Sequence, residues 1–167
     1  MNTTKFNQFL NQFSKHSLLV IDHTISLDSY VPINISDKNK DLSNFDIYSS
    51  LEWEKYINLF LEDKNAKVAF GGYLEKRNIY DRSDYFKCLA ENKRRNIHLG
   101  IDFWCKEHTK VLAVLDGEIH SFKNNNNYGD YGPTIILKHY LEGEVFYTLY
   151  GHLSLSSIEK LTVGDLV

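Results

Sequence analysis

The sequence predicts a mainly β protein, a twisted antiparallel sheet preceded by an N-terminal α-helical appendage. In the first 66 residues, apolar side chains recur at spacings of three and four, the period of a helix. From Val68 onward, short runs rich in β-branched and aromatic residues alternate with clusters of Gly, Asn and Asp. The pair Asp116-Gly117 is a strong signal for a hairpin turn. We therefore expect a helical appendage over residues 1–66 and a β domain over residues 67–167.

Two stretches of the appendage have helical spacing. Residues 5–19 place four apolar side chains on one face, namely Phe6, Phe9, Leu10 and Phe13. Residues 51–61 do the same with Trp53, Tyr56, Ile57, Phe60 and Leu61. A stretch rich in Asp, Lys, Asn and Ser, residues 29–47, separates them and is predicted to be a polar connection.

The β domain is expected to consist of successive hairpins. The predicted strands are residues 111–115, 118–122, 134–138 and 145–150. Turns are expected at Asp116-Gly117 and at residues 142–144, and a polar loop at residues 124–130.

Composition and charge exclude several classes of function. The net charge is −3 and no dense block of Lys and Arg is present, so we expect no nucleic-acid partner. No stretch approaches the roughly 20 apolar residues of a membrane span. The N-terminus lacks the apolar core of a secretory signal, which predicts a cytoplasmic protein. The two cysteines, Cys88 and Cys105, are expected to be free thiols.

The first candidate site is His98-Leu99-Gly100-Ile101-Asp102, where an imidazole and a carboxylate stand four positions apart. Both groups are common ligands of catalytic zinc. In a strand, His98 and Asp102 would share one face. The intervening Leu99 and Ile101 would then point into the core. A straight strand would hold the two α-carbons about 13 Å apart, so we expect the backbone to bend at Gly100.

The second candidate is His152, which follows Tyr150 and Gly151 at the end of the last predicted strand. An imidazole there would suit general acid–base work or stabilise charge on a tetrahedral intermediate. Glu75 and Arg77 would either line a substrate groove or form a solvated ion pair. Tyr150 would either pack in the sheet or donate to an oxyanion. The residues alone leave these alternatives open.

The order of these pieces resembles the lysostaphin and LytM type of zinc metalloendopeptidase, a family of peptidoglycan hydrolases with a duplicated hybrid motif. Its pattern runs from His-x-Gly-x-Asp through an Asp-Gly hairpin to Tyr-x-His-Leu-Ser and Val-Gly-Asp-x-Val. The matching pieces here are His98 to Asp102, Asp116-Gly117, Tyr150 to Ser154 and Val163 to Val167. The resemblance covers residues 96–167. The run from Gly72 to Arg77 looks like the branch of this family that is fused to aminotransferase and kinase-like domains.

The resemblance implies a barrel-sandwich hybrid fold and a zinc cofactor held by His98 and Asp102. It implies that His152 is a catalytic residue near the metal. The substrate class it implies is a peptide, such as the stem or cross-bridge peptides of peptidoglycan, and we expect Arg77 and Tyr150 to contact it. Members of the family are often extracytoplasmic, in contrast to the cytoplasmic location predicted from the N-terminus.

One ligand of the family pattern lies beyond the match. The third ligand is the second histidine of a His-x-His motif that follows Val-Gly-Asp-x-Val, and the sequence ends at Val167. We therefore expect an incomplete zinc site and impaired hydrolysis. The remaining histidines of the β domain are expected to be surface or hydrogen-bonded structural residues, namely His108, His120 and His139.

The alternative function is a non-catalytic binding or regulatory module of a larger protein, built on the same β fold. Zinc that is lost on His98→Ala or Asp102→Ala would favour the enzyme. A chain that binds no stoichiometric metal would favour the module.

Overall fold

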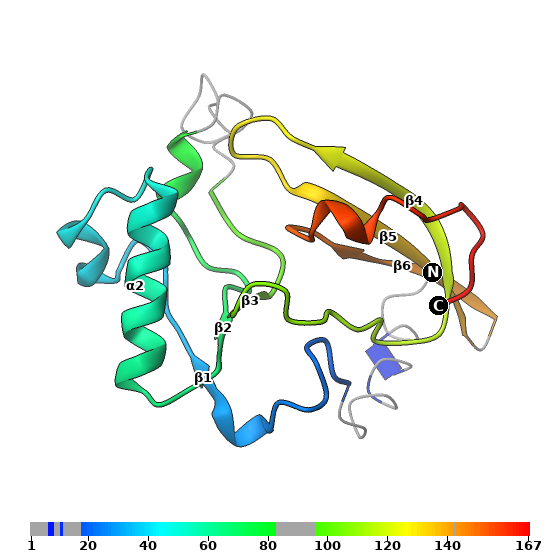
Figure 1. The fold of residues 1–167 in the computed structure, drawn as a ribbon, viewed down its shortest axis with the longest axis horizontal. Coiled ribbons are helices and arrows are strands. Elements are labelled where there is room, and N and C mark those ends of the chain that lie inside the picture. The colour runs from blue at the N-terminus through cyan, green and yellow to red at the C-terminus, as the bar shows by residue number, and fades with distance from the viewer. Residues whose placement is uncertain (1–6, 9–10, 12–17, 83–95, 142) are drawn as a thin grey trace. The chain divides into compact units, whose positions relative to one another are not determined.

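The computed structural model describes residues 7–8, 11, 18–82, 96–141 and 143–167, and Figure 1 shows its ribbon. Its contacts divide into two units. One unit is Thr24–His108, and the other combines Met1–His23 with Thr109–Val167. Each unit contains a three-stranded sheet. The predicted mainly β fold with an α-helical appendage is confirmed, whereas the domain boundary expected at residue 66 stays a prediction.

The sheet of the unit Thr24–His108 combines strands distant in sequence. Its strands are β1 (Tyr30–Pro32), β2 (Val68–Gly71) and β3 (Asp102–Cys105), in the order β1-β2-β3. β2 is antiparallel to β3, as predicted for residues 67–167, and parallel to β1, a pairing with the appendage that the sequence did not predict. Parallel neighbours need a long crossover, and the crossover from β1 to β2 contains helix α2 (Ser50–Asp63).

Helix α2 confirms the second predicted helix and begins at a side-chain cap. The hydroxyl of Ser49 accepts a hydrogen bond from the backbone N–H of Glu52 at 3.3 Å, which satisfies one of the unpaired donors of the first turn. After its end, Asn65 takes a positive φ of 49°. The helix packs on β2, as Figure 1 shows. A core cluster of this unit is formed by the buried residues Ile33, Ile35, Ile57 and Ala69, and Val68 of β2 is fully buried as well.

The described residues of this unit also form three short 3-10 helices. They are η1 (Leu27–Ser29), η2 (Lys40–Asn44) and η3 (Ile79–Arg82). Together with β1, η2 lies within residues 29–47, so the predicted polar connection contains regular structure that the composition did not indicate.

The sheet of the second unit is antiparallel, as predicted. Its strands are β4 (Glu118–Asn125), β5 (Gly132–Leu141) and β6 (Glu144–Tyr150), in that order. Three predicted strands, 118–122, 134–138 and 145–150, are confirmed and prove longer than expected. Gly143 has a φ of 80°, consistent with the predicted turn between β5 and β6. The short helix η5 (Leu155–Ser157) follows β6.

The predicted hairpin between residues 111–115 and 118–122 is wrong. Val111 instead forms an isolated bridge with Ile21, and the backbone N–H of Leu112 donates to Val20. Gly117 pairs through both its N–H and its C=O with Val167. The backbone groups of residues 111 and 112 therefore pair with residues that are distant in sequence. A local turn signal such as Asp116-Gly117 cannot predict these pairings.

Several predictions concern the ends and the surface. The apolar positions of the predicted N-terminal helix, Phe6 to Phe13, lie outside the described residues, although Asn7, Gln8 and Asn11 are helical. Cys88 also lies outside them, and Cys105 forms no disulfide with any described residue. None of the helices in the described part of the chain has the length and apolarity that a membrane crossing requires.

Candidate metal centre

Two segments of the unit Thr24–His108 pair their backbones and carry the first candidate site. The N–H of Leu74 donates to the carbonyl of His98, and the N–H of His98 donates to Glu75, both at 2.8 Å. The N–H of Arg77 donates to Asn96 at 2.8 Å. Residues 72–77 and 96–98 therefore lie side by side, and this pairing brings side chains from the two segments into one site.

The imidazole of His98 and the carboxylate of Asp102 converge. Nε2 of His98 lies 3.4 Å from Oδ1 of Asp102, and the two side chains are 17% and 27% exposed. Nδ1 of His98 lies 3.0 Å from the carbonyl oxygen of Gly72. Because a carbonyl only accepts, Nδ1 donates this hydrogen bond. When the ring is neutral, Nε2 therefore presents its lone pair toward the carboxylate.

The expected bend at Gly100 is present, and it explains how two residues four positions apart meet. Strand β3 begins only at Asp102, so residues 98–101 do not alternate between two faces. Leu99 and Ile101 are 72% and 60% exposed, and the expectation that they point into the core is wrong.

The second oxygen of Asp102 faces Arg77. Nη1 of Arg77 lies 2.6 Å from Oδ2 of Asp102. The contact lacks hydrogen-bond angles, and Oδ2 is buried with no hydrogen-bond partner among the described residues. Because the two charges are this close, the contact is an ion pair. On its other side, Arg77 donates from Nε and Nη2 to Oε2 of Glu75, at 3.1 and 3.0 Å.

Glu75 and Arg77 are 15% and 6% exposed, so the reading of a solvated ion pair is wrong. Oε1 of Glu75 also accepts from the backbone N–H of Ile35 at 3.2 Å. Both charged groups are therefore anchored to the interior of the unit. That Arg77 contacts a substrate stays a prediction, and its burial leaves little of its surface for that role.

Gly72 lies at the centre of this arrangement. A Cβ there would lie 2.3 Å from Nη2 of Arg77, 2.8 Å from Nδ1 of His98 and 3.1 Å from Oδ2 of Asp102. Its φ of 101° is one that side chains with a Cβ rarely adopt. Sequence reasoning did not identify Gly72 as part of the site, and the doublet Gly71-Gly72 was the only local signal.

The pair His98 and Asp102 fits a zinc ion. In a tetrahedral site with bonds of about 2.0–2.2 Å, two ligand atoms lie about 3.4 Å apart, and the two facing atoms are separated by 3.4 Å. Both atoms are acceptors when the ring is neutral, so they repel unless a cation or a proton lies between them. The hydrogen bond from Nδ1 to a backbone carbonyl is the usual outer contact of a metal-bound histidine.

His152 belongs to the other unit, Met1–His23 with Thr109–Val167. It follows the end of β6 with a φ of 56°, and its side chain is exposed. Its backbone N–H donates to the carbonyl of Tyr131 at 2.7 Å, and the two rings lie 5.9 Å apart. The convergence of His152 on the His98–Asp102 pair stays a prediction. Within the described residues, no group of three or more His, Cys, Asp or Glu side chains gathers as a metal cage.

Residues 96–167 match the model of peptidase family M23. The match covers less than half of the 167 residues and includes His98, Asp102 and His152. No curated protein and no solved structure matches the chain. The chain therefore carries an M23-like segment, residues 96–167, and this similarity supports a peptidase-like function.

Arg77 and Gly72 both precede position 96 and lie outside the M23-like segment, although they contact Asp102 and His98 inside it. Tyr150 lies inside it, at the end of β6, and its hydroxyl accepts a hydrogen bond from the backbone N–H of Val114 at 3.0 Å. Tyr150 therefore anchors the segment that precedes β4. That it also contacts a substrate stays a prediction.

The other histidines of the M23-like segment have ordinary surroundings. His108 is 77% exposed in a turn and lies 3.5 Å from Glu107. His120 is exposed on β4, 5.0 Å from the ring of Tyr147. His139 is 1% exposed and hydrogen-bonded at both ring nitrogens. The expectation of surface or hydrogen-bonded structural histidines is confirmed for these three.

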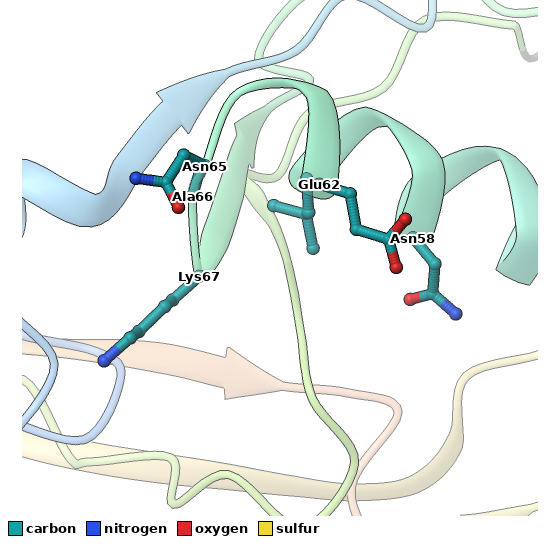
Figure 2. Close-up of a pocket in the computed structure, with 6 residues that line it drawn as sticks. Asn58, Glu62, Asn65, Ala66 and Lys67 are labelled. Carbon is teal, nitrogen blue, oxygen red and sulfur yellow. The ribbon is translucent and has the colours of Figure 1, made fainter.

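A hollow at the C-terminal end of α2 is lined by Asn58, Leu61, Glu62, Asn65, Ala66 and Lys67. Figure 2 shows that Lys67 extends away from Glu62, so the two opposite charges do not converge. The hollow shares no lining residue with the His98–Asp102 pair. We assign no chemistry to it.

Proposed function

We propose that the M23-like segment is a zinc-dependent endopeptidase domain in which His98 and Asp102 hold the metal and His152 is the catalytic histidine. The observation that carries this proposal is the 3.4 Å approach of Nε2 of His98 to Oδ1 of Asp102, with the opposite ring nitrogen hydrogen-bonded to Gly72. The family match supports the reaction class, which is hydrolysis of a peptide bond.

A zinc ion, when bound, polarises a peptide carbonyl and lowers the pKa of a bound water toward neutrality. The protein contributes orientation. The hydrogen bond from Nδ1 of His98 to Gly72 fixes the tautomer, so that the lone pair of Nε2 is available to coordinate the metal. Asp102 supplies a negative oxygen beside it. His152, in its exposed turn, is the group that we assign to proton transfer.

The proposed substrates are peptides of the bacterial cell wall, either stem peptides or glycine-containing cross-bridges. This substrate class rests on the resemblance of the motifs to the lysostaphin and LytM type and on the family match.

Zinc binding to the full chain tests the metal site. At a zinc concentration just high enough to load a weak two-ligand site, equilibrium dialysis followed by elemental analysis should find zinc bound to the wild type and little or none bound to His98→Ala and Asp102→Ala. The matched control is His108→Ala, which removes an exposed imidazole from the same unit and should leave zinc bound. Equal zinc content in all four proteins would contradict the assignment of the ligands.

Hydrolysis of a quenched fluorescent pentaglycine peptide tests the reaction. His152→Ala should keep the zinc and reduce the rate by about 10²–10⁴-fold. The matched control is His120→Ala, an exposed histidine of the same unit. A wild-type chain that binds no zinc and does not hydrolyse the peptide, but binds it intact, would favour the alternative of a non-catalytic module.

A further inference from the structure

Asp102 presents its two oxygens to two different partners. Oδ1 faces Nε2 of His98 at 3.4 Å, and Oδ2 faces Nη1 of Arg77 at 2.6 Å. A carboxylate that is held at one oxygen cannot turn freely about its side-chain torsions, so the position of the other oxygen is restricted as well. The orientation of Oδ1 toward His98 therefore depends on what holds Oδ2.

Arg77 is itself held firmly. Nε and Nη2 donate to the same oxygen of Glu75, whose other oxygen accepts from the backbone of Ile35. The planar guanidinium can contact Glu75 through one edge and Asp102 through another, whereas an ammonium group offers a single point charge. This continuous set of contacts links Asp102 to Ile35, a buried residue of the unit's core.

The charges of this group leave a site that favours a cation. Arg77 contributes one positive charge, and Glu75 and Asp102 contribute two negative charges. A buried arginine requires only one carboxylate for neutrality, and Glu75 already provides it through two hydrogen bonds. The remaining negative charge is located on Asp102, on the partly exposed side where His98 offers its lone pair.

We propose that Arg77 is a positioning residue, which orients the carboxylate of Asp102 so that one oxygen is presented beside His98 for a divalent cation. The inference rests on the proposed function. Arg77 acts through Asp102 and does not touch the cation. It lies outside the matched residues 96–167, so the family match assigns it no role.

The zinc affinity of the full chain, measured by competition with a chromogenic chelator, tests this role. Arg77→Met should weaken binding by about 10- to 100-fold, as expected for the loss of an outer contact of a metal ligand. Arg77→Lys keeps the charge needed by Glu75 and should fold, yet it should also weaken binding because the fork is lost. The matched control is Lys76→Met, which removes the same charge from an exposed side chain next in sequence.

A second readout separates positioning from a merely structural role. At higher zinc concentrations, at which Asp102→Ala still binds weakly through His98, adding Arg77→Lys should no longer change the zinc affinity, because the carboxylate that it orients is gone. An equal loss in both backgrounds, or no loss in either, would overturn the inference.

The inference and the proposed function fail differently. If the wild type binds no zinc, the proposed function fails, and crystal structures of the metal-free wild type and Arg77→Lys decide the inference. In the variant, Oδ1 of Asp102 should turn away from Nε2 of His98. An unchanged carboxylate orientation in that structure would overturn the positioning role.

Discussion

Gly72 accepts, through its carbonyl oxygen, a hydrogen bond from Nδ1 of His98 at 3.0 Å. The same residue has a φ of 101° and no space for a Cβ. We therefore expect Gly72→Ala to lower the free energy of unfolding by about 2–4 kcal/mol, from backbone strain together with overpacking. It should also weaken zinc binding, because the carbonyl that orients the ring must move. Urea denaturation and chelator competition measure the two effects.

The control for this substitution is Gly164→Ala. Gly164 has a similar φ of 94°, but a Cβ there meets nothing within 4 Å. Its substitution should therefore show only the strain of the backbone, about 1–2 kcal/mol, and no change in zinc affinity. Equal losses of stability at the two glycines would show that the contacts around Gly72 are not tight.

Gly100 offers a substitution that should affect the site more than the fold. A Cβ at this position would lie 3.3 Å from Nε2 of His98 and 3.4 Å from Cε1, and its φ is not in the positive range. Gly100→Val should change the free energy of unfolding by less than about 1 kcal/mol. The branched side chain should nevertheless cover Nε2 and weaken zinc binding about tenfold or more.

Chelator competition on Gly100→Val is compared with Leu99→Ala, which alters an exposed neighbour that is 72% accessible. Leu99→Ala should bind zinc like the wild type. If Gly100→Val also does so, Nε2 of His98 is not the atom that faces the metal.

Local patterns in the sequence predicted part of the fold and of the site. Helix α2 and strands β5 and β6 follow from the period of their apolar residues. The approach of His98 and Asp102 was expected because a glycine between them allows a bend. These features involve residues that are close in sequence, where the choice of conformation determines which side chains meet.

Contacts between distant segments could not be predicted in this way. The hydrogen bond of His98 spans 26 positions to Gly72, and nothing in either segment alone specifies the other. The parallel pairing of β1 with β2 and the pairing of Val111 with Ile21 are of the same kind. The burial of Arg77 depends on these pairings, and Arg and Glu close in sequence are more often a solvated pair.

Tyr150 is expected to stabilise the M23-like segment through its hydroxyl. Tyr150→Phe removes the acceptor for the backbone N–H of Val114 and should lower the free energy of unfolding by about 1 kcal/mol. Thermal denaturation measures this change. Tyr147→Phe is the matched control, because Tyr147 lies on the same strand and is 53% exposed, so the loss of its hydroxyl should leave the melting temperature unchanged. Equal melting temperatures for the two variants would contradict the role of the Tyr150 hydroxyl.

His139 should be the histidine that stability requires most among those of the second unit that the structure describes. It is 1% exposed, with Nδ1 3.0 Å from the carbonyl of Asp116 and Nε2 2.8 Å from the hydroxyl of Thr148. A neutral ring that donates from Nδ1 and accepts at Nε2 satisfies both partners. Its ring also stacks on Phe146 at 4.9 Å.

Substituting His139→Phe keeps most of the volume and the stacking but leaves the carbonyl of Asp116 and the hydroxyl of Thr148 without this partner. The free energy of unfolding should fall by about 1–3 kcal/mol, the desolvation penalty of buried polar groups that lose a hydrogen bond. The same substitution at the exposed His120 should change it by less than about 0.5 kcal/mol. Urea denaturation curves of the two variants make the comparison. A His139→Phe protein as stable as the wild type would mean that these two hydrogen bonds contribute nothing to the stability of the fold.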